Sequence, residues 1–78
     1  MIVRYFARFR EAAGKEKEVI EIGPHSTVSR AMETIRMMHP WLAKEQNVLI
    51  AVNATYAKPD DRISDSDELA IFPAVSGG

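Results

Sequence analysis

Residues 68–72 read Glu-Leu-Ala-Ile-Phe, and residues 2–10 read Ile-Val-Arg-Tyr-Phe-Ala-Arg-Phe-Arg. These two stretches carry the strongest information about the fold. Both stretches alternate as half-buried strands do. One face of the first strand is expected to carry Val3, Tyr5, Ala7 and Phe9, and the other Arg4, Arg8 and Arg10. In the last strand Leu69 and Ile71 share one face, while Ala70 and Phe72 share the other. Because both strands are apolar, we expect them to pair in parallel at the centre of a sheet.

The segment between these strands predicts one main helix. Thr27, or Ser26 before it, can cap the helix, and Pro40 disfavours helical geometry at the residue before it, so the helix should end near Met38. Trp41 and Leu42 are then expected to fold back under it. The apolar stripe of the helix is predicted to be Val28, Ala31, Met32, Ile35 and Met38.

Shorter elements complete the pattern. Residues 11–14 predict a helical turn closed by Gly14, and residues 17–22 predict a second strand. Residues 48–52 are a continuous apolar run of strand length, followed by a tight turn at Asn53-Ala54 and a short strand at 55–58. The sequence therefore predicts an α+β fold, in which a mixed sheet of about five strands is covered on one face by one main helix. The β-grasp, or ubiquitin-like, arrangement has this order.

Length and composition exclude several classes of protein. A chain of 78 residues has room for one domain, which we place at residues 1–72, with a flexible tail at 73–78 that ends in Gly-Gly. With no cysteine there is no disulfide, thiolate metal site or thiol nucleophile. Acidic and basic residues nearly cancel, 11 against 10, so nucleic acid and membrane surfaces are not expected partners. The start of the chain has no pattern of a targeting signal and the longest apolar run is five residues, so we expect a cytoplasmic protein.

No constellation of side chains indicates catalysis. His25 and His39 are the only histidines, and without cysteine they do not form a zinc set, so no metal site is predicted. The aspartates at 60–61, 65 and 67 fall in predicted loops, where turn chemistry explains them.

Two features of the sequence indicate contacts with other proteins instead. The first is the tail, because glycine lacks a Cβ and a Gly-Gly end can enter a narrow channel and present its carboxylate to another protein. The second is the pair Phe6 and Phe72, which fall on the face opposite the helix, with Arg4, Arg8 and Arg10 expected around them. Such a pair is typical of a partner surface. The alternative is that the sheet twists and a loop covers the rings.

Several segments together resemble the small subunit of molybdopterin synthase, the MoaD-type branch of the ubiquitin-like sulfur carriers. The most specific is the ending Phe72-Pro73-Ala74-Val75-Ser76-Gly77-Gly78. The other matching segments are Tyr5-Phe6-Ala7 with Arg10-Glu11 and Gly14, Thr27-Val28, and Ala51-Val52-Asn53. The chain departs from the family at Ala74, where relatives often have a second proline, and this should leave the tail slightly more flexible.

The resemblance implies a β-grasp fold and a function carried by the Gly78 carboxylate. In the family an ATP-dependent activating enzyme adenylates this carboxylate, and a sulfur donor converts it to a thiocarboxylate. The large synthase subunit then uses the sulfur to build molybdopterin from cyclic pyranopterin monophosphate. The resemblance also implies that Gly77, Ser76, Val75 and Pro73 fit the partner's channel, and that Phe6 and Phe72 contact the large subunit. On this view the chain binds no cofactor stably and is no enzyme on its own.

Other functions remain open at this point. The same adenylate could lead to sulfur delivery for thiamin or tRNA, or to conjugation of Gly78 to lysines of other proteins, as ubiquitin is conjugated. An adaptor domain whose tail has no chemical role is a further alternative.

Overall fold

The first and last strands lie side by side at the centre of the sheet, as the sequence predicts. The computed structural model describes residues 1–74. Strand β1 (Ile2–Tyr5) pairs in parallel with β7 (Glu68–Pro73). The sheet order is β2-β1-β7-β4-β5, and every pair other than β1 with β7 is antiparallel. The remaining strands of this sheet are β2 (Lys17–Val19), β4 (Val48–Val52) and β5 (Thr55–Tyr56). The prediction of a mixed sheet of five strands is confirmed.

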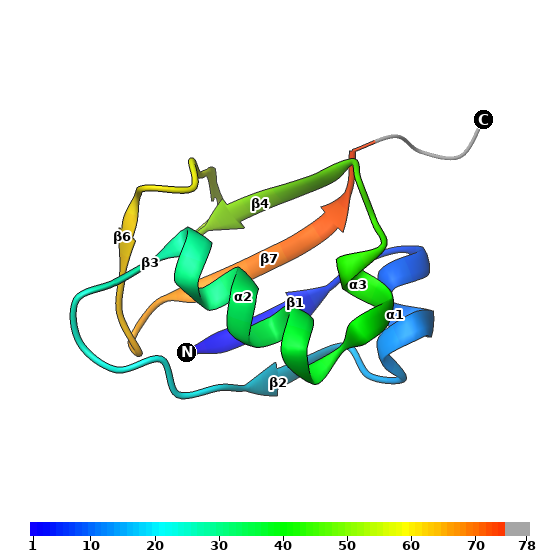
Figure 1. Ribbon diagram of the computed structural model, residues 1–78, viewed down its shortest axis with the longest axis horizontal. Coiled ribbons are helices and arrows are strands. Elements are labelled where there is room, and N and C mark those ends of the chain that lie inside the picture. The colour runs from blue at the N-terminus through cyan, green and yellow to red at the C-terminus, as the bar shows by residue number, and fades with distance from the viewer. Residues whose placement is uncertain (75–78) are drawn as a thin grey trace.

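Helix α2 (Val28–Met38) covers one face of this sheet (Figure 1). The hydroxyl of Thr27 accepts a hydrogen bond from the backbone N–H of Arg30 at 3.3 Å, which confirms the predicted cap. The buried stripe is Val28, Ala31, Met32 and Ile35. Met38 was predicted to belong to it, and this is wrong, because the helix ends there and half of the residue is exposed.

A second short helix, α3 (Pro40–Ala43), follows directly. Its proline occupies the first turn, where the missing N–H costs no hydrogen bond. Leu42 is fully buried and Trp41 packs against the core, so the chain folds back as expected, but in a helical turn.

The first strand is shorter than predicted. It ends at Tyr5, and helix α1 (Arg8–Ala13) begins where the alternating pattern continues. Ala7 has φ 52° and ψ −134°, and the N–H of Phe9 donates to the carbonyl of Phe6 at 3.0 Å, so the chain turns at this point. The turn places Phe9 in the core, 5.5 Å from the ring of Trp41. The helix closes at Gly14, which has φ 74°, as predicted.

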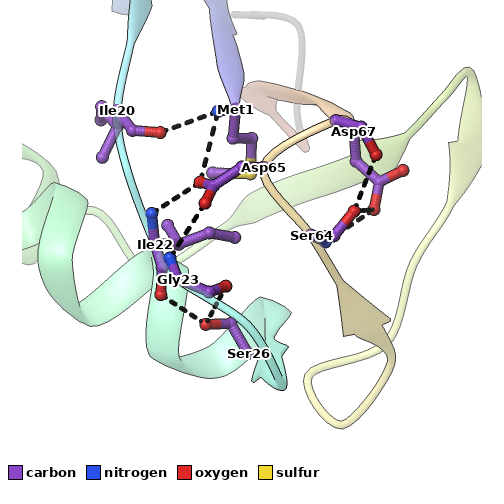
Figure 2. Close-up of polar contacts among 9 residues, drawn as sticks. Met1, Ile20, Ile22, Gly23, Ser26, Ser64, Asp65 and Asp67 are labelled. Carbon is purple, nitrogen blue, oxygen red and sulfur yellow. Dashed lines mark hydrogen bonds and ion pairs between the residues drawn. The ribbon is translucent and has the colours of Figure 1, made fainter.

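Aspartate side chains hold the loops at the end of the sheet that lies away from helix α1 (Figure 1). Asp65 accepts hydrogen bonds from the backbone N–H groups of Ile22 (2.8 Å) and Gly23 (3.2 Å), and the Met1 amine lies 3.5 Å from it (Figure 2). The N–H groups of Ile22 and Gly23 therefore bond to a side chain and not to a neighbouring strand, and β2 ends at Val19, short of the predicted end at Ile22. Asp67 likewise accepts from the N–H of Ser64 at 2.8 Å. The interpretation as a turn residue is confirmed for Asp67, whereas Asp65 joins its loop to a distant one.

A small second sheet was not predicted. It pairs β3 (Ser26–Thr27) with β6 (Arg62–Ile63) in antiparallel register. Two-residue strands carry too few side chains to produce a periodic pattern, so no pattern in the sequence could have predicted them. By contrast, the turn at Asn53-Ala54 is confirmed, with φ values of 50° and 69° that are typical of a type I′ hairpin.

The hydrophobic core lies between the sheet and the helices. Ile71, Leu69 and Val3 from the central strands are fully buried, and so are Ile35 and Leu42 from the helices. Within residues 1–74 no helix is long and apolar enough to cross a membrane.

Candidate functional site

Three aromatic rings gather on the face of the sheet that the helices leave open. Leu69 and Ile71 point into the core, so Phe72, the next residue of the strand, points to the open face. The ring centroids of Phe6 and Phe72 are 6.1 Å apart and nearly perpendicular, and Tyr56 lies 5.9 Å from Phe72. We call Phe6, Tyr56 and Phe72 the aromatic surface.

The aromatic surface borders an open, apolar hollow. Phe6 is 43% exposed and Tyr56 is 70% exposed. The hollow is lined by Phe6, Phe72 and the small residues Ala51, Ala54 and Ala70. Within residues 1–74 no loop covers these rings, which removes the alternative that the sequence left open. An exposed apolar group of this kind is typical of a protein-binding surface.

Tyr56 was missed from the sequence, although a signal for it existed. The hairpin turn at Asn53-Ala54 places Tyr56 opposite Ala51 on the neighbouring strand. Ala51 pairs in turn with Ala70 of β7, which shares its face with Phe72. Counting along this predicted hairpin would have put Tyr56 on the open face.

The three arginines expected around the pair have carboxylate partners within the chain. Arg4, on β1, forms an ion pair with Glu68. It lies on the open face because its register partner is Ala70. Arg8 and Arg10, by contrast, belong to α1, so the alternation that was expected to set them beside Phe6 does not extend to them. Arg8 pairs with Glu45, and Arg10 lies 3.5 Å from Glu16. A direct role of these arginines in partner binding stays a prediction.

The base of the tail is part of the sheet. Pro73 is the last residue of β7 and pairs with Val48, so the strand extends one residue beyond the predicted boundary at 72. The N–H of Ala74 donates to the carbonyl of Asn47 at 2.8 Å. The predicted sulfur-bearing residue Gly78 and the channel residues Gly77, Ser76 and Val75 lie outside the described residues.

A partly buried polar cluster lies on the helix-covered side of the sheet. One carboxylate oxygen of Glu18 accepts from the Tyr5 hydroxyl at 2.5 Å and lies 2.6 Å from Nε2 of His39. Burial and the Glu18 carboxylate raise the pKa of Tyr5 far above its ordinary value. Burial by itself raises the pKa of Glu18, but the hydrogen bonds from Tyr5 and His39 and the charge of Lys15 outweigh it and hold that pKa low.

This cluster joins three elements of structure. Tyr5 is on β1, Glu18 on the edge strand β2, and His39 at the junction of α2 and α3. The side chains of Glu18 and His39 are only 12% and 15% exposed. The cluster therefore fastens the edge strand to the helices. Among residues 1–74 no three histidine, aspartate or glutamate side chains come together as a metal site.

Comparison with known proteins shows which family this chain resembles. The ThiS family matches residues 3–78. The molybdopterin synthase sulfur carrier subunit of Chlamydomonas reinhardtii is 35% identical over 97% of this chain and 95% of its own length. A molybdopterin converting factor subunit 1 structure from Pyrococcus furiosus has a TM-score of 0.87 and 35% identity over 95% of both chains. The crystal structure of SAMP1 from Haloferax volcanii has a TM-score of 0.87 and 28% identity over 100% of this chain and 98% of its own.

Proposed function

Because this chain belongs to the ThiS family, we propose that it is a sulfur carrier whose Gly78 carboxylate is converted to a thiocarboxylate for molybdopterin synthesis. The observation that carries the proposal is the likeness to curated sulfur carrier subunits of molybdopterin synthase over nearly the whole chain. The family match extends to Gly78, the residue on which the chemistry depends.

The chemistry explains why the carrier needs a partner enzyme. A carboxylate is an anion without a good leaving group, so a sulfur nucleophile does not displace its oxygen. Adenylation by ATP, with release of pyrophosphate, turns the carboxylate into a mixed anhydride whose leaving group is AMP. A sulfur donor then attacks the carbonyl carbon, AMP departs, and the thiocarboxylate remains on Gly78. The large synthase subunit would then transfer this sulfur to cyclic pyranopterin monophosphate, the precursor from which molybdopterin is built.

The described part of the chain suits a carrier that is passed between partners. We expect the activating enzyme and the large subunit to use the aromatic surface, since it is apolar and open and one of its residues, Phe72, lies on the last strand, just before the tail. No cofactor needs to stay bound, because ATP is used by the activating enzyme. On its own the chain is expected to turn nothing over.

Intact-mass spectrometry tests the sulfur proposal directly. The full chain is incubated with the family's activating enzyme, ATP and a sulfide source. We expect a mass gain equal to the replacement of one oxygen atom by sulfur, and none after deletion of Gly77-Gly78. Without that gain in the wild type, the proposal fails. Mixing the thiolated chain with large subunit and pterin precursor then separates molybdopterin synthesis from delivery to thiamin or tRNA.

Conjugation to proteins is the second candidate function. The observation that favours it is the likeness to SAMP1, a small archaeal modifier protein. In this reaction a lysine amine of a target protein, and not a sulfur donor, would displace AMP from Gly78. The test is an ATP-dependent ladder of tagged conjugates in cells of the source organism, absent for the chain without Gly77-Gly78. Absence of the ladder in the wild type excludes this candidate and leaves the sulfur proposal untouched.

A further inference from the structure

The described part of the chain ends at the tip of β7, beside the two short helices (Figure 1). Figure 1 shows that α1 and α3 lie at the end of the sheet where β7 finishes. The N–H of Ala74 donates to the carbonyl of Asn47 at 2.8 Å. This bond lies one residue beyond the pair of Val48 with Pro73, so it continues the β4–β7 ladder and ties the last described residue to the sheet.

The loop that supplies this carbonyl is itself held in place. Residues 44–47 connect α3 to β4. The N–H of Glu45 donates to the carbonyl of the buried Leu42 at 3.0 Å, and the Glu45 carboxylate forms an ion pair with Arg8. Arg8 begins α1, and its guanidinium carbon is 5.0 Å from the ring centre of the buried Phe9. The loop is thus connected on one side to the tail base and on the other to the core.

We propose that Arg8 is a positioning residue, which holds Glu45 and the 44–47 loop so that Asn47 fixes the direction in which the tail leaves the sheet. The inference rests on the proposed function, because a fixed exit reduces the backbone entropy that is lost when a partner's channel takes up the tail. It also gives Arg8 a role through contacts within the chain, in place of the direct partner contact predicted from the sequence.

The first readout needs no partner. We expect Arg8→Gln and Glu45→Gln each to speed hydrogen exchange of the Ala74 amide about threefold, as loss of an ordinary surface ion pair would. The double variant should show no further increase, and the charge-swapped variant R8E/E45R should restore the slow rate. Arg62→Gln, which makes the same change on β6 at the far end of the molecule, should leave Ala74 unaffected.

The second readout uses the activating enzyme. Arg8→Gln and Glu45→Gln should raise KM for the carrier about threefold with kcat unchanged, since the chemical groups belong to the partner. Unchanged exchange at Ala74 in both variants would overturn the proposal. An effect of Arg8→Gln that Glu45→Gln does not share would overturn it too, because Arg8 would then act on the partner directly. If the wild type never gains sulfur, the proposed function fails, while the exchange rates still decide the role of Arg8.

Discussion

Replacing Glu18 by glutamine tests how the edge strand is held to the helices. The carboxylate takes part in two short hydrogen bonds, with Tyr5 and with His39, and its side chain is only 12% exposed. A hydrogen bond to a charged group contributes about 1.5 to 3 kcal/mol, and glutamine keeps one neutral acceptor oxygen. We therefore expect Glu18→Gln to lower the free energy of unfolding by about 2 kcal/mol. For a domain of this size the melting temperature should fall by about 10 °C.

The same variant should change the response to acid. Folding holds the pKa of Glu18 below its ordinary value of 4.5. A carboxyl group with a lowered pKa stabilises the fold above its unfolded pKa, and this contribution is lost as the pH falls through the folded pKa. The stability difference between wild type and Glu18→Gln should therefore be full at pH 7 and shrink below about pH 4.

Urea titration followed by Trp41 fluorescence measures both effects. Trp41 is the only tryptophan, and its ring lies 6.0 Å from that of His39. Glu16→Gln is a matched control, because this side chain is 77% exposed, and its effect should stay within about 0.5 kcal/mol. If Glu18→Gln proves as stable as this control, or if its deficit is the same at pH 3 and pH 7, the reasoning about the cluster is refuted.

Three further predictions concern the turn, the surface and the hairpin. Ala7→Gly should raise the free energy of unfolding by about 1 kcal/mol, because glycine adopts a φ of 52° without strain; a loss of stability in denaturant titration would contradict this. Phe72→Asp should weaken binding of the large subunit at least about tenfold in calorimetry while the chain still folds, and unchanged binding would remove the aromatic surface from the proposed interface. Asn53→Ala should cost about 1 kcal/mol in thermal unfolding, since its side chain donates to Asp67 at 2.9 Å and accepts from the N–H of Glu68 at 3.0 Å. An unaltered melting temperature would show that these two hydrogen bonds do not contribute to the stability of the fold.

Periodicity in the sequence was sufficient to predict the main helix and the longer strands. The stripe of α2 from Val28 to Ile35, the apolar run of β4 and the alternation of β7 each satisfy a local rule, because burial of one face requires a repeat of 3.6 or 2 residues. The parallel pairing of β1 with β7 followed from their apolar character. The sequence placed Phe6 and Phe72 out of phase with the core, and the structure decided that their rings stay open and uncovered.

Contacts between segments that are distant in the sequence determined the end of the first strand and the pairing of the charged side chains. Alternation continued through Phe9, yet the chain turns at Ala7, because packing of Phe9 on Trp41 outweighs the backbone strain. The meeting of Glu18 with His39, and of Arg8 with Glu45, joins residues 21 and 37 positions apart, which no local repeat records. Local patterns were enough to predict the sheet and its covering helix. The pairing of charges and the contacts at the base of the tail became visible in the folded chain alone, because they depend on which loops the core brings together.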